Sequence, residues 1–468
     1  MESTDDVRRL FEDQRAAFAE SPPGYAHRLA ALTALERALA ARRDDLVAAV
    51  ADDFGGRAAE ETLALELVPL LNEIRFARRN LKRWMAPRRA SVQWSCWPAR
   101  ARIVYQPLGV VGVLSPWNYP IFLCLAPLAG ILAAGNHALL KPSELAPSSA
   151  RLIQSIIAAT FPSSYVTVLT GGADLAAELT RLPLDHLLFT GSTRVGRLVM
   201  KAASENLVPV TLELGGKSPA IVHAEYPLET AATRILTGKL YNAGQTCVAP
   251  DYVLVPRGQT GDFVNAARTA IARLYPTLVE NPDYTRIING QHYARLTELV
   301  DDARRRGAGI VTVAPPGETC GPSNRVFPPT LVTAVRDDMA LLQEEIFGPI
   351  LPIVEYAAVD DALAYVESRP HPLALYYFDI DRSRVNRVLE RVAAGGVTVN
   401  DCLFHVGQPS LPFGGVGPSG MGRYHGFDGF QAFSHKKGVL MQARWTPLSL
   451  LRPPYDTRTR RILRLLLR

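Results

Sequence analysis

Two residues in the middle of the chain carry side chains suited to covalent catalysis, a thiol and a carboxylate. The thiol is Cys247, in the stretch YNAGQTCVAP, where small and polar residues flank the sulfur. A reactive cysteine needs such an accessible setting, and because a free thiol is mostly protonated at neutral pH, its site must favour the thiolate. A buried structural cysteine is the alternative interpretation.

The carboxylate is Glu213, in TLELGGKSP, directly after an apolar run that predicts a strand. A carboxylate at the end of a buried strand is partly desolvated, which raises its pKa and makes it a usable general base. If Cys247 forms a thioester, such a base can activate the water that hydrolyses it. A glutamate that caps a loop or a helix is the alternative.

Asn118 is a third candidate, in the stretch SPWNYP, where Pro116 and Pro120 restrict the loop. A fixed side-chain amide can donate a hydrogen bond to an oxyanion that develops on a substrate, which is worth about 10²–10³ in rate. An ordinary turn asparagine is the alternative.

Three further motifs could bind parts of a dinucleotide, and the alternative is that each is a simple turn or surface feature. In FTGSTRVG, Gly191 and Ser192 precede a predicted helix, whose amide-rich start can hold a pyrophosphate. In KPSE, Lys141 and Glu144 could hold ribose hydroxyls, and Glu144 would repel a 2′-phosphate. The motif EEIFGP joins a carboxylate and an aromatic ring to a Gly-Pro turn. No histidine spacing suggests a metal site, and there is no P-loop and no GxSxG.

Buried strands that alternate with helices must position these residues. The apolar runs GVVGVLSP, HALLKPSE, HLLFTGS and PVTLELGG each end in a polar cluster, and helical stretches separate them. This pattern predicts an α/β fold with parallel sheets covered on both faces. Ligands of such sheets bind at the carboxyl ends of the strands, where the candidate residues lie.

The composition is typical of a globular protein with two or three domains. The chain has 468 residues, 48% of them hydrophobic and 21% charged, with a net charge of +6 and no basic stripe that would indicate a nucleic-acid partner. Five scattered cysteines favour a reducing, cytoplasmic location. The polar start is unlike a signal peptide, and no apolar run is long enough to cross a bilayer.

Seven motifs occur in one order along the chain: PWNYP, KPSE, FTGST, LELGGKSP, GQTC, EEIFGP and PFGG. Together they resemble the aldehyde dehydrogenase superfamily over nearly the whole chain. The stretch LPFGGVGPSGMGRYHG is similar to the class 3 branch. YNAGQTCVAPDYVL and RPHPLALYYFD are most similar to the coniferyl aldehyde dehydrogenases within that branch.

The resemblance implies two Rossmann-like parallel-sheet domains, a small oligomerisation flap and a homodimer. The implied parts are a dinucleotide-binding domain (1–82 and 104–212), a catalytic domain (213–398), an oligomerisation or bridging segment (83–103 and 399–432) and a C-terminal tail (433–468).

The resemblance also implies a role for each candidate. Cys247 is the nucleophile, Glu213 the general base, and Asn118 with the backbone amide of Cys247 the oxyanion hole. The implied cofactor is NAD, with NADP as a further possibility. The residues implied to hold it are Lys141 and Glu144 at the adenosine ribose, Gly191 and Ser192 at the pyrophosphate, and Glu345 and Phe347 at the nicotinamide end.

The expected function is therefore NAD(P)-dependent oxidation of an aromatic, coniferyl aldehyde-like aldehyde to its acid. The alternatives are a long-chain aliphatic aldehyde as substrate, a cofactor-independent cysteine esterase and a non-catalytic relative. No metal is expected. The tail RTRRILRLLLR places leucines between arginines at helical spacing, which predicts a solvated or subunit-packed helix, with contact to a membrane surface as the less favoured alternative.

Overall fold

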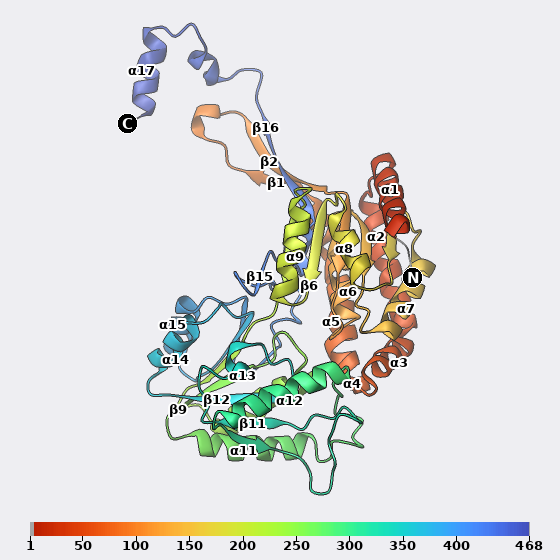
Figure 1. The fold of residues 1–468 in the computed structure, drawn as a ribbon. Helices are drawn as coiled ribbons and strands as arrows, with labels where there is room; N and C mark the ends of the chain where they lie inside the picture. The colour runs from red at the N-terminus through yellow and green to blue at the C-terminus, as the bar shows by residue number, and fades with distance from the viewer. Residues whose placement is uncertain (1–3, 468) are drawn as a thin grey trace.

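The computed structural model describes residues 4–467, which form two α/β bodies and a projecting arm (Figure 1). The first body is built on a six-stranded sheet of order β15-β7-β6-β3-β4-β5, in which only β15 is antiparallel to its neighbour. Its strands are β3 (Val110–Leu114), β4 (His137–Lys141), β5 (Val166–Val168), β6 (His186–Thr190), β7 (Val210–Glu213) and β15 (Gly420–Met421).

Helices cover this sheet and bury its apolar strands. Every residue of β3, β4, β6 and α6 is buried, as the continuous apolar runs predicted. The helices are α1 (Thr4–Glu20), α2 (Tyr25–Ala41), α3 (Arg43–Phe54), α4 (Ala59–Thr62), the π-helical turn η1 (Leu63–Leu67), α5 (Val68–Met85), α6 (Phe122–Ala134), α7 (Pro147–Thr160), α8 (Ala173–Arg181), α9 (Thr193–Ser204) and α16 (Gly426–Ala432).

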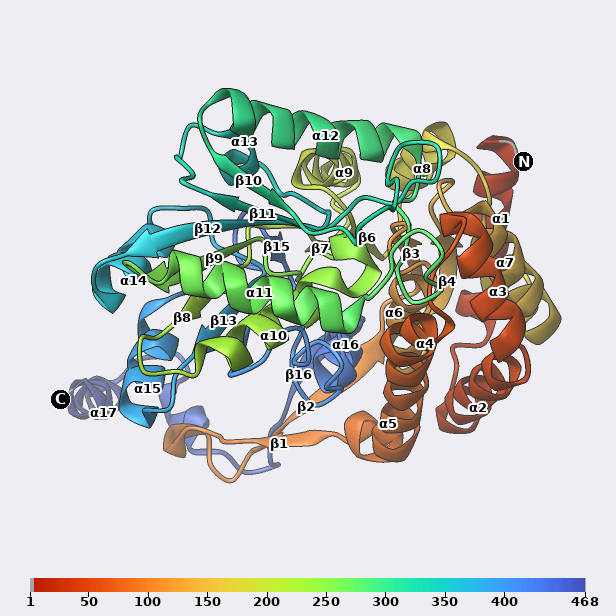
Figure 2. The same ribbon diagram turned by 90° about the horizontal axis from the view of Figure 1, so that it is seen from below.

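The second body has a seven-stranded sheet of order β10-β11-β12-β9-β8-β13-β14, parallel except for β10. Its helices α11 and α12 lie on opposite sides of this sheet (Figure 2). The strands are β8 (Pro219–Val222), β9 (Tyr252–Pro256), β10 (Gly309–Thr312), β11 (Thr330–Thr333), β12 (Ile350–Tyr356), β13 (Ala374–Phe378) and β14 (Gly396–Val399). The helices are α10 (Leu228–Leu240), η3 (Tyr241–Gly244), α11 (Thr260–Leu274), α12 (Gly290–Arg305), α13 (Ala340–Gln343), α14 (Val359–Glu367) and α15 (Arg382–Arg391). The predicted α/β fold with two parallel sheets is confirmed.

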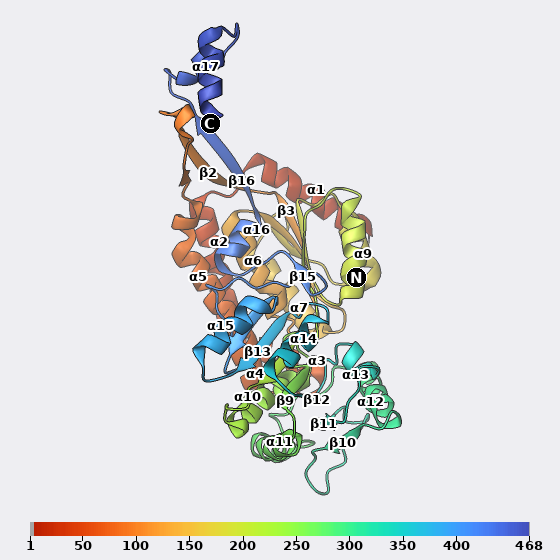
Figure 3. The ribbon, with the colours of Figure 1, turned by 90° about the vertical axis from the view of Figure 1, so that its left-hand side faces the viewer.

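A three-stranded antiparallel sheet of order β1-β2-β16 projects from the first body (Figure 3). It comprises β1 (Arg88–Ala90), β2 (Arg100–Pro107) and β16 (Ser434–Met441), with the short turn η2 (Trp94–Cys96) between the first two. The strand that pairs with the 83–103 excursion is β16, inside the segment expected as the tail. Residues 399–432 instead supply β15 and α16 to the first body.

The chain ends beyond this arm, in η4 (Pro447–Leu451) and α17 (Thr457–Leu466), which lie far from both bodies (Figures 1 and 3). Among residues 4–467, no helix combines the length and the apolar character needed to cross a membrane.

Candidate active site between the two bodies

The loop that carries Cys247 has a left-handed backbone immediately before the cysteine. Asn242 and Ala243 have φ values of 52° and 50°, and Gly244 follows with a φ of 74°. A Cβ on Gly244 would lie 2.3 Å from the carbonyl oxygen of Gly348, so only glycine fits there without displacing the chain. The turn ends α10 and directs the chain into the cleft between the bodies.

Cys247 is half-buried and lines a cavity of about 230 Å³, so it is not the sealed structural cysteine of the alternative interpretation. The cavity wall is mostly apolar and comes from segments far apart in the sequence. It includes Leu65, Val68, Tyr119, Phe122, Tyr241, Thr246, Val248, Leu403, Phe404 and Phe413. An apolar cavity that reaches a thiol suits a substrate with an apolar body and one reactive group.

Glu213 ends β7, as the sequence predicted, and its carboxylate is buried. Neither carboxylate oxygen has a hydrogen-bond partner among the described residues. Burial without a compensating donor raises the pKa of Glu213 well above its usual value. Such a carboxylate takes up a proton readily, which is the property that a general base requires.

The sulfur lies within the electrostatic reach of two carboxylates. Burial, together with the charges of Glu345 and Glu213, raises the pKa of Cys247 to about 12. The protein's own groups therefore favour the neutral thiol, whereas the sequence predicted a site that favours the thiolate. The main physical reason is desolvation, which disfavours the charged thiolate. The two acidic side chains nearby add to this because they oppose a further negative charge.

Asn118 is buried in the loop between β3 and α6. Its Nδ2 donates to the backbone oxygen of Gln245, 3.0 Å away and two residues before Cys247. The hydroxyl groups of Tyr119 and Thr246 form a second link between the same two loops, at 2.7 Å. The structure thus brings Asn118 to the cysteine loop, although 129 positions separate Asn118 and Cys247 in the sequence.

A second, larger cleft of about 770 Å³ lies at the carboxyl ends of β3, β4 and β6. Lys141 and Glu144 line it and form an ion pair with an Nζ–Oε2 distance of 2.6 Å. Gly191 and Ser192 line it too, and Ser192 caps α9 by accepting a hydrogen bond from the amide of Val195. The four residues expected at the adenosine and pyrophosphate end of a dinucleotide therefore share one cleft, next to a helix N-terminus.

Glu345 and Phe347 come from the other body, after α13. Glu345 lines a third cavity of about 520 Å³, and its Oε1 has no hydrogen-bond partner in the described part of the chain. Burial and the charge of Asp251 raise the pKa of Glu345 to about 8. A Cβ on Gly215 would lie 2.0 Å from Oε2 of Glu345, so this glycine lets the carboxylate approach the strand end that carries Glu213.

Phe347 has a φ of 53°, and its ring packs edge-on against Trp117 at a centroid distance of 5.4 Å. Trp117 also lines the 770 Å³ cleft, so Phe347 lies near the junction of the two bodies. Among residues 4–467, no cluster of His, Cys, Asp and Glu side chains has the geometry to hold a metal ion.

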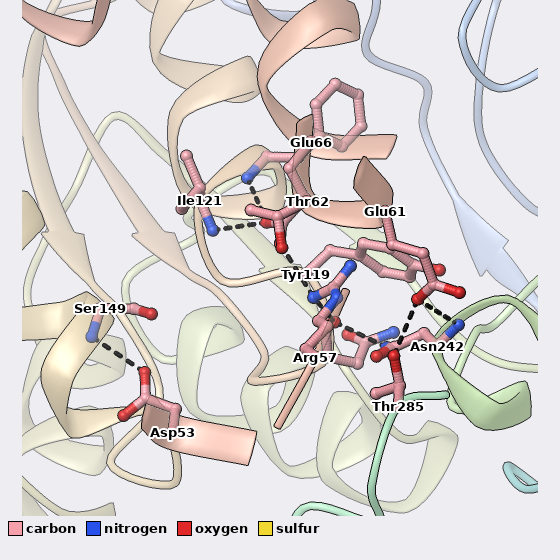
Figure 4. Close-up of polar contacts among 12 residues, drawn as sticks. Asp53, Arg57, Glu61, Thr62, Glu66, Tyr119, Ile121, Ser149, Asn242 and Thr285 are labelled. Atoms are coloured by element: carbon pink, nitrogen blue, oxygen red, sulfur yellow. Dashed lines mark hydrogen bonds and ion pairs between the residues drawn. The ribbon is translucent and has the colours of Figure 1, made fainter. Parts of the chain in front are cut away.

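Sequence reasoning missed a buried polar network that joins the segment of residues 57–66 to the loops of Asn118 and Cys247 (Figure 4). Arg57 and Glu66 form an ion pair of 2.9 Å with both side chains fully buried, and Glu61 lies beside them. The signal was present in EETLALELVP, where carboxylates interrupt an apolar helical stretch. The sequence did not reveal their partners, because these come from distant parts of the chain.

The comparisons with known proteins agree with this geometry. The sequence model of the aldehyde dehydrogenase family matches residues 2–439. A probable coniferyl aldehyde dehydrogenase of Pseudomonas aeruginosa is 49% identical over 450 residues, which are 96% of this chain and 94% of the relative.

Two solved structures are similar over almost the whole length. AldH of Staphylococcus aureus, in a substrate-bound state, superposes with a TM-score of 0.93 at 39% identity and 100% coverage of both chains. An aldehyde dehydrogenase of Mycobacterium tuberculosis, complexed with NAD+, gives a TM-score of 0.86 at 28% identity and covers 95% of this chain and 92% of its own. The chain therefore belongs to the aldehyde dehydrogenase family, as its seven ordered motifs predicted.

Proposed function

We propose that this aldehyde dehydrogenase oxidises an aromatic, coniferyl aldehyde-like aldehyde to its carboxylic acid through a covalent intermediate on Cys247. The observation that carries the proposal is the half-buried thiol at the wall of an apolar cavity, close enough to the carboxylate of Glu213 for its charge to act on the sulfur. Among residues 4–467, neither oxygen of Glu213 has a hydrogen-bond partner that would explain its burial.

Cys247 attacks the aldehyde carbon, and a carbon–sulfur bond forms as the carbonyl oxygen becomes an oxyanion. The thiol first passes its proton to one of the two carboxylates that interact with it, Glu213 or Glu345. The side-chain amide of Asn118 and the backbone amide of Cys247 stabilise the oxyanion. Asn118 suits this role because its contact with Gln245 fixes its amide beside the cysteine loop.

The clefts of the two bodies suit a nicotinamide dinucleotide. Lys141 and Glu144 would hold the adenosine ribose, Gly191 and Ser192 the pyrophosphate, and Glu345 and Phe347 the nicotinamide end. NAD, when bound, accepts the hydride that the tetrahedral carbon must lose to become a thioester. NAD is supported by the complex of the Mycobacterium tuberculosis relative and by Glu144, whose charge disfavours a 2′-phosphate.

Glu213 completes the reaction by removing a proton from water, which attacks the thioester and releases the acid and the thiol. The raised pKa of its buried carboxylate suits this step, since proton transfer is most effective when the pKa of the base lies near the working pH. A cofactor-independent cysteine esterase would need the same thiol and base. Reduction of NAD in the presence of an aldehyde distinguishes the two activities.

The substrate assignment rests on the aromatic and apolar wall of the Cys247 cavity and on the coniferyl aldehyde dehydrogenase relative. The alternative is a long-chain aliphatic aldehyde. A panel of aromatic and aliphatic aldehydes, run with NAD and NADP, is expected to give the highest kcat/KM with a coniferyl-like aldehyde and NAD. A preference for long-chain aliphatic aldehydes would support the alternative.

Phe404→Ala is expected to lower kcat/KM for the aromatic aldehydes about three- to tenfold, because one ring contact is worth about 0.5–1.5 kcal/mol. Phe404 lines the cavity and is 52% exposed, so it lies at the rim rather than in the core. The kcat/KM for propanal, which is too small to use this contact, is the control and is expected to stay unchanged. An equal loss for both substrates would contradict the assigned contact.

We also propose that the enzyme is a cytoplasmic homodimer joined through the arm. The arm and the chain just beyond it expose three tryptophans, each by at least 68%: Trp94, Trp97 and Trp445. Strand β1 of the arm has no buried residue. Exposed aromatic residues of this kind are typical of interfaces. All five cysteines are free thiols, which suits a reducing compartment.

Sedimentation velocity is expected to give a dimer, and Trp94→Ala with Trp97→Ala is expected to shift it toward the monomer. A wild-type monomer would contradict the proposal. Liposome flotation, with and without residues 455–468, tests the alternative role of α17 at a membrane surface. Flotation that depends on those residues would support the alternative.

A further inference from the structure

Two buried carboxylates, separated by five positions, accept hydrogen bonds from the loops that carry Cys247 and Asn118. Figure 4 shows them with Asn242 and Ile121 of those loops. Glu61 belongs to α4 and Glu66 to η1, the π-helical turn that follows. In a regular α-helix, residues five apart point about 140° away from each other. The i→i+5 bonding of a π-helical turn changes this relation, and such turns are frequent at functional sites.

Glu61 holds the cysteine loop by its backbone. Its Oε2 accepts hydrogen bonds from the backbone N of Asn242 and from Oγ1 of Thr285, each at 2.9 Å. The side chain of Asn242 then donates to the backbone oxygens of Asn118, at 2.9 Å, and Gln245, at 3.1 Å. Glu61 is therefore connected, through one residue, to both loops of the proposed active site.

The turn that Glu61 holds is strained. Asn tolerates a left-handed backbone because its polar side chain can hydrogen-bond locally. Ala243 next to it has no such group, so this conformation costs it about 1–2 kcal/mol. A strained conformation persists only when surrounding contacts fix it. Besides the contact from Glu61, the side chain of Gln245 fixes the turn by donating to the backbone oxygens of Asn242 and Arg286.

Glu66 and Arg57 hold the other loop in the same way. Oε2 of Glu66 accepts hydrogen bonds from the backbone N of Ile121, at 2.8 Å, and of Phe122, at 3.0 Å. Arg57 bonds Oε1 of Glu66 and donates to the backbone oxygen of Asn118, at 3.2 Å. The short segment of residues 57–66 thus forms hydrogen bonds with the backbone of both loops.

We propose that Glu61 is a positioning residue that sets the distance between the sulfur of Cys247 and the amide of Asn118 through the backbone N of Asn242. The inference rests on the proposed function, in which the two groups act on the same carbonyl. Without Glu61, the N–H of Asn242 and the hydroxyl of Thr285 lose their acceptor, and the strained turn can relax. A misplacement of about 1 Å between reacting groups can cost about 10²-fold in rate.

The test is a double-mutant cycle on the pre-steady-state burst of reduced cofactor, with an aromatic aldehyde and saturating NAD. Glu61→Ala is expected to slow the burst about 10²-fold. If Glu61 acts by fixing the distance between the sulfur and the Asn118 amide, Glu61→Ala is expected to have almost no effect on the burst rate in an Asn118→Ala background. The reason is that the effects of substitutions at residues that act as a unit are not additive. The affinity for NAD and the thermal unfolding midpoint are measured for all four proteins.

Three further variants sharpen the result. Glu61→Gln keeps an acceptor oxygen and is expected to restore most of the burst rate, whereas Glu61→Asp withdraws the oxygen and is expected to lose about tenfold. Glu60→Ala, which removes an exposed carboxylate next to Glu61, is the matched control and is expected to leave the rate unchanged. If Glu61→Ala does not fold, Glu61→Asp takes its place in the cycle.

The inference is overturned if the change at Glu61 slows the burst equally with and without Asn118, or if folded Glu61→Ala keeps the wild-type burst. Failure of the proposed function would look different. In that case Cys247→Ala would still turn over aldehyde, whatever the result at Glu61.

Discussion

Cys247→Ala is expected to reduce the formation of reduced cofactor from an aldehyde by at least about 10⁴-fold, while NAD still binds. Alanine removes the sulfur that bonds to the aldehyde carbon in the proposed reaction, so neither the thiohemiacetal nor the thioester can arise. The change removes only the Sγ atom at the cavity wall, and the residues that line the cofactor cleft are elsewhere. Cofactor fluorescence measures the formation of reduced cofactor, and titration calorimetry measures the binding of NAD.

The matched control is Cys96→Ala, which removes a half-buried thiol on the arm, far from the active site. It is expected to keep the wild-type rate. Substantial turnover by Cys247→Ala would refute the assignment of Cys247 as the nucleophile. Loss of NAD binding in that variant would contradict the separate placement of the Cys247 cavity and the cofactor cleft.

Glu213→Gln is expected to keep a burst of reduced cofactor of one equivalent per active site, and then to lose about 10²–10⁴ in steady-state rate. The amide cannot take a proton from water, so the thioester accumulates on Cys247. Rapid-mixing absorbance measures the burst, and mass spectrometry of the quenched protein measures the acyl adduct. Unchanged steady-state turnover would rule out Glu213 as the essential base.

The pH dependence gives an independent check on the same residue. A carboxyl group is a base only above its pKa, and burial raises the pKa of Glu213. The rate of acid release is therefore expected to rise with pH, and the midpoint of this rise is expected to lie well above the usual pKa range of carboxyl groups. This rise of the rate with pH is expected to disappear in Glu213→Gln. It is expected to persist in Glu229→Gln, which changes an exposed carboxylate on α10.

Much of the fold was predictable because its signals are local. The apolar runs that end at Leu114, Lys141, Thr190 and Glu213 are the strands β3, β4, β6 and β7. Parallel strands bring their carboxyl ends to one edge, so polar residues after each run had to gather there. The pairing of β2 with β16 was not predictable in the same way, since their registers join residues 100–107 to 434–441 and no local pattern encodes such a contact.

The sequence by itself determined the chemical inventory: one thiol among small residues, one carboxylate at a strand end, an amide in a proline-restricted loop, and their order along the chain. Only the tertiary structure decided the electrostatics and the positions of these groups. It buries Glu213 with no donor among residues 4–467, places two carboxylates near the thiol, and fixes both loops on Glu61 and Glu66. The physical reason is that a pKa and a strained turn depend on desolvation and on contacts between residues far apart in the chain, which no single segment of sequence specifies.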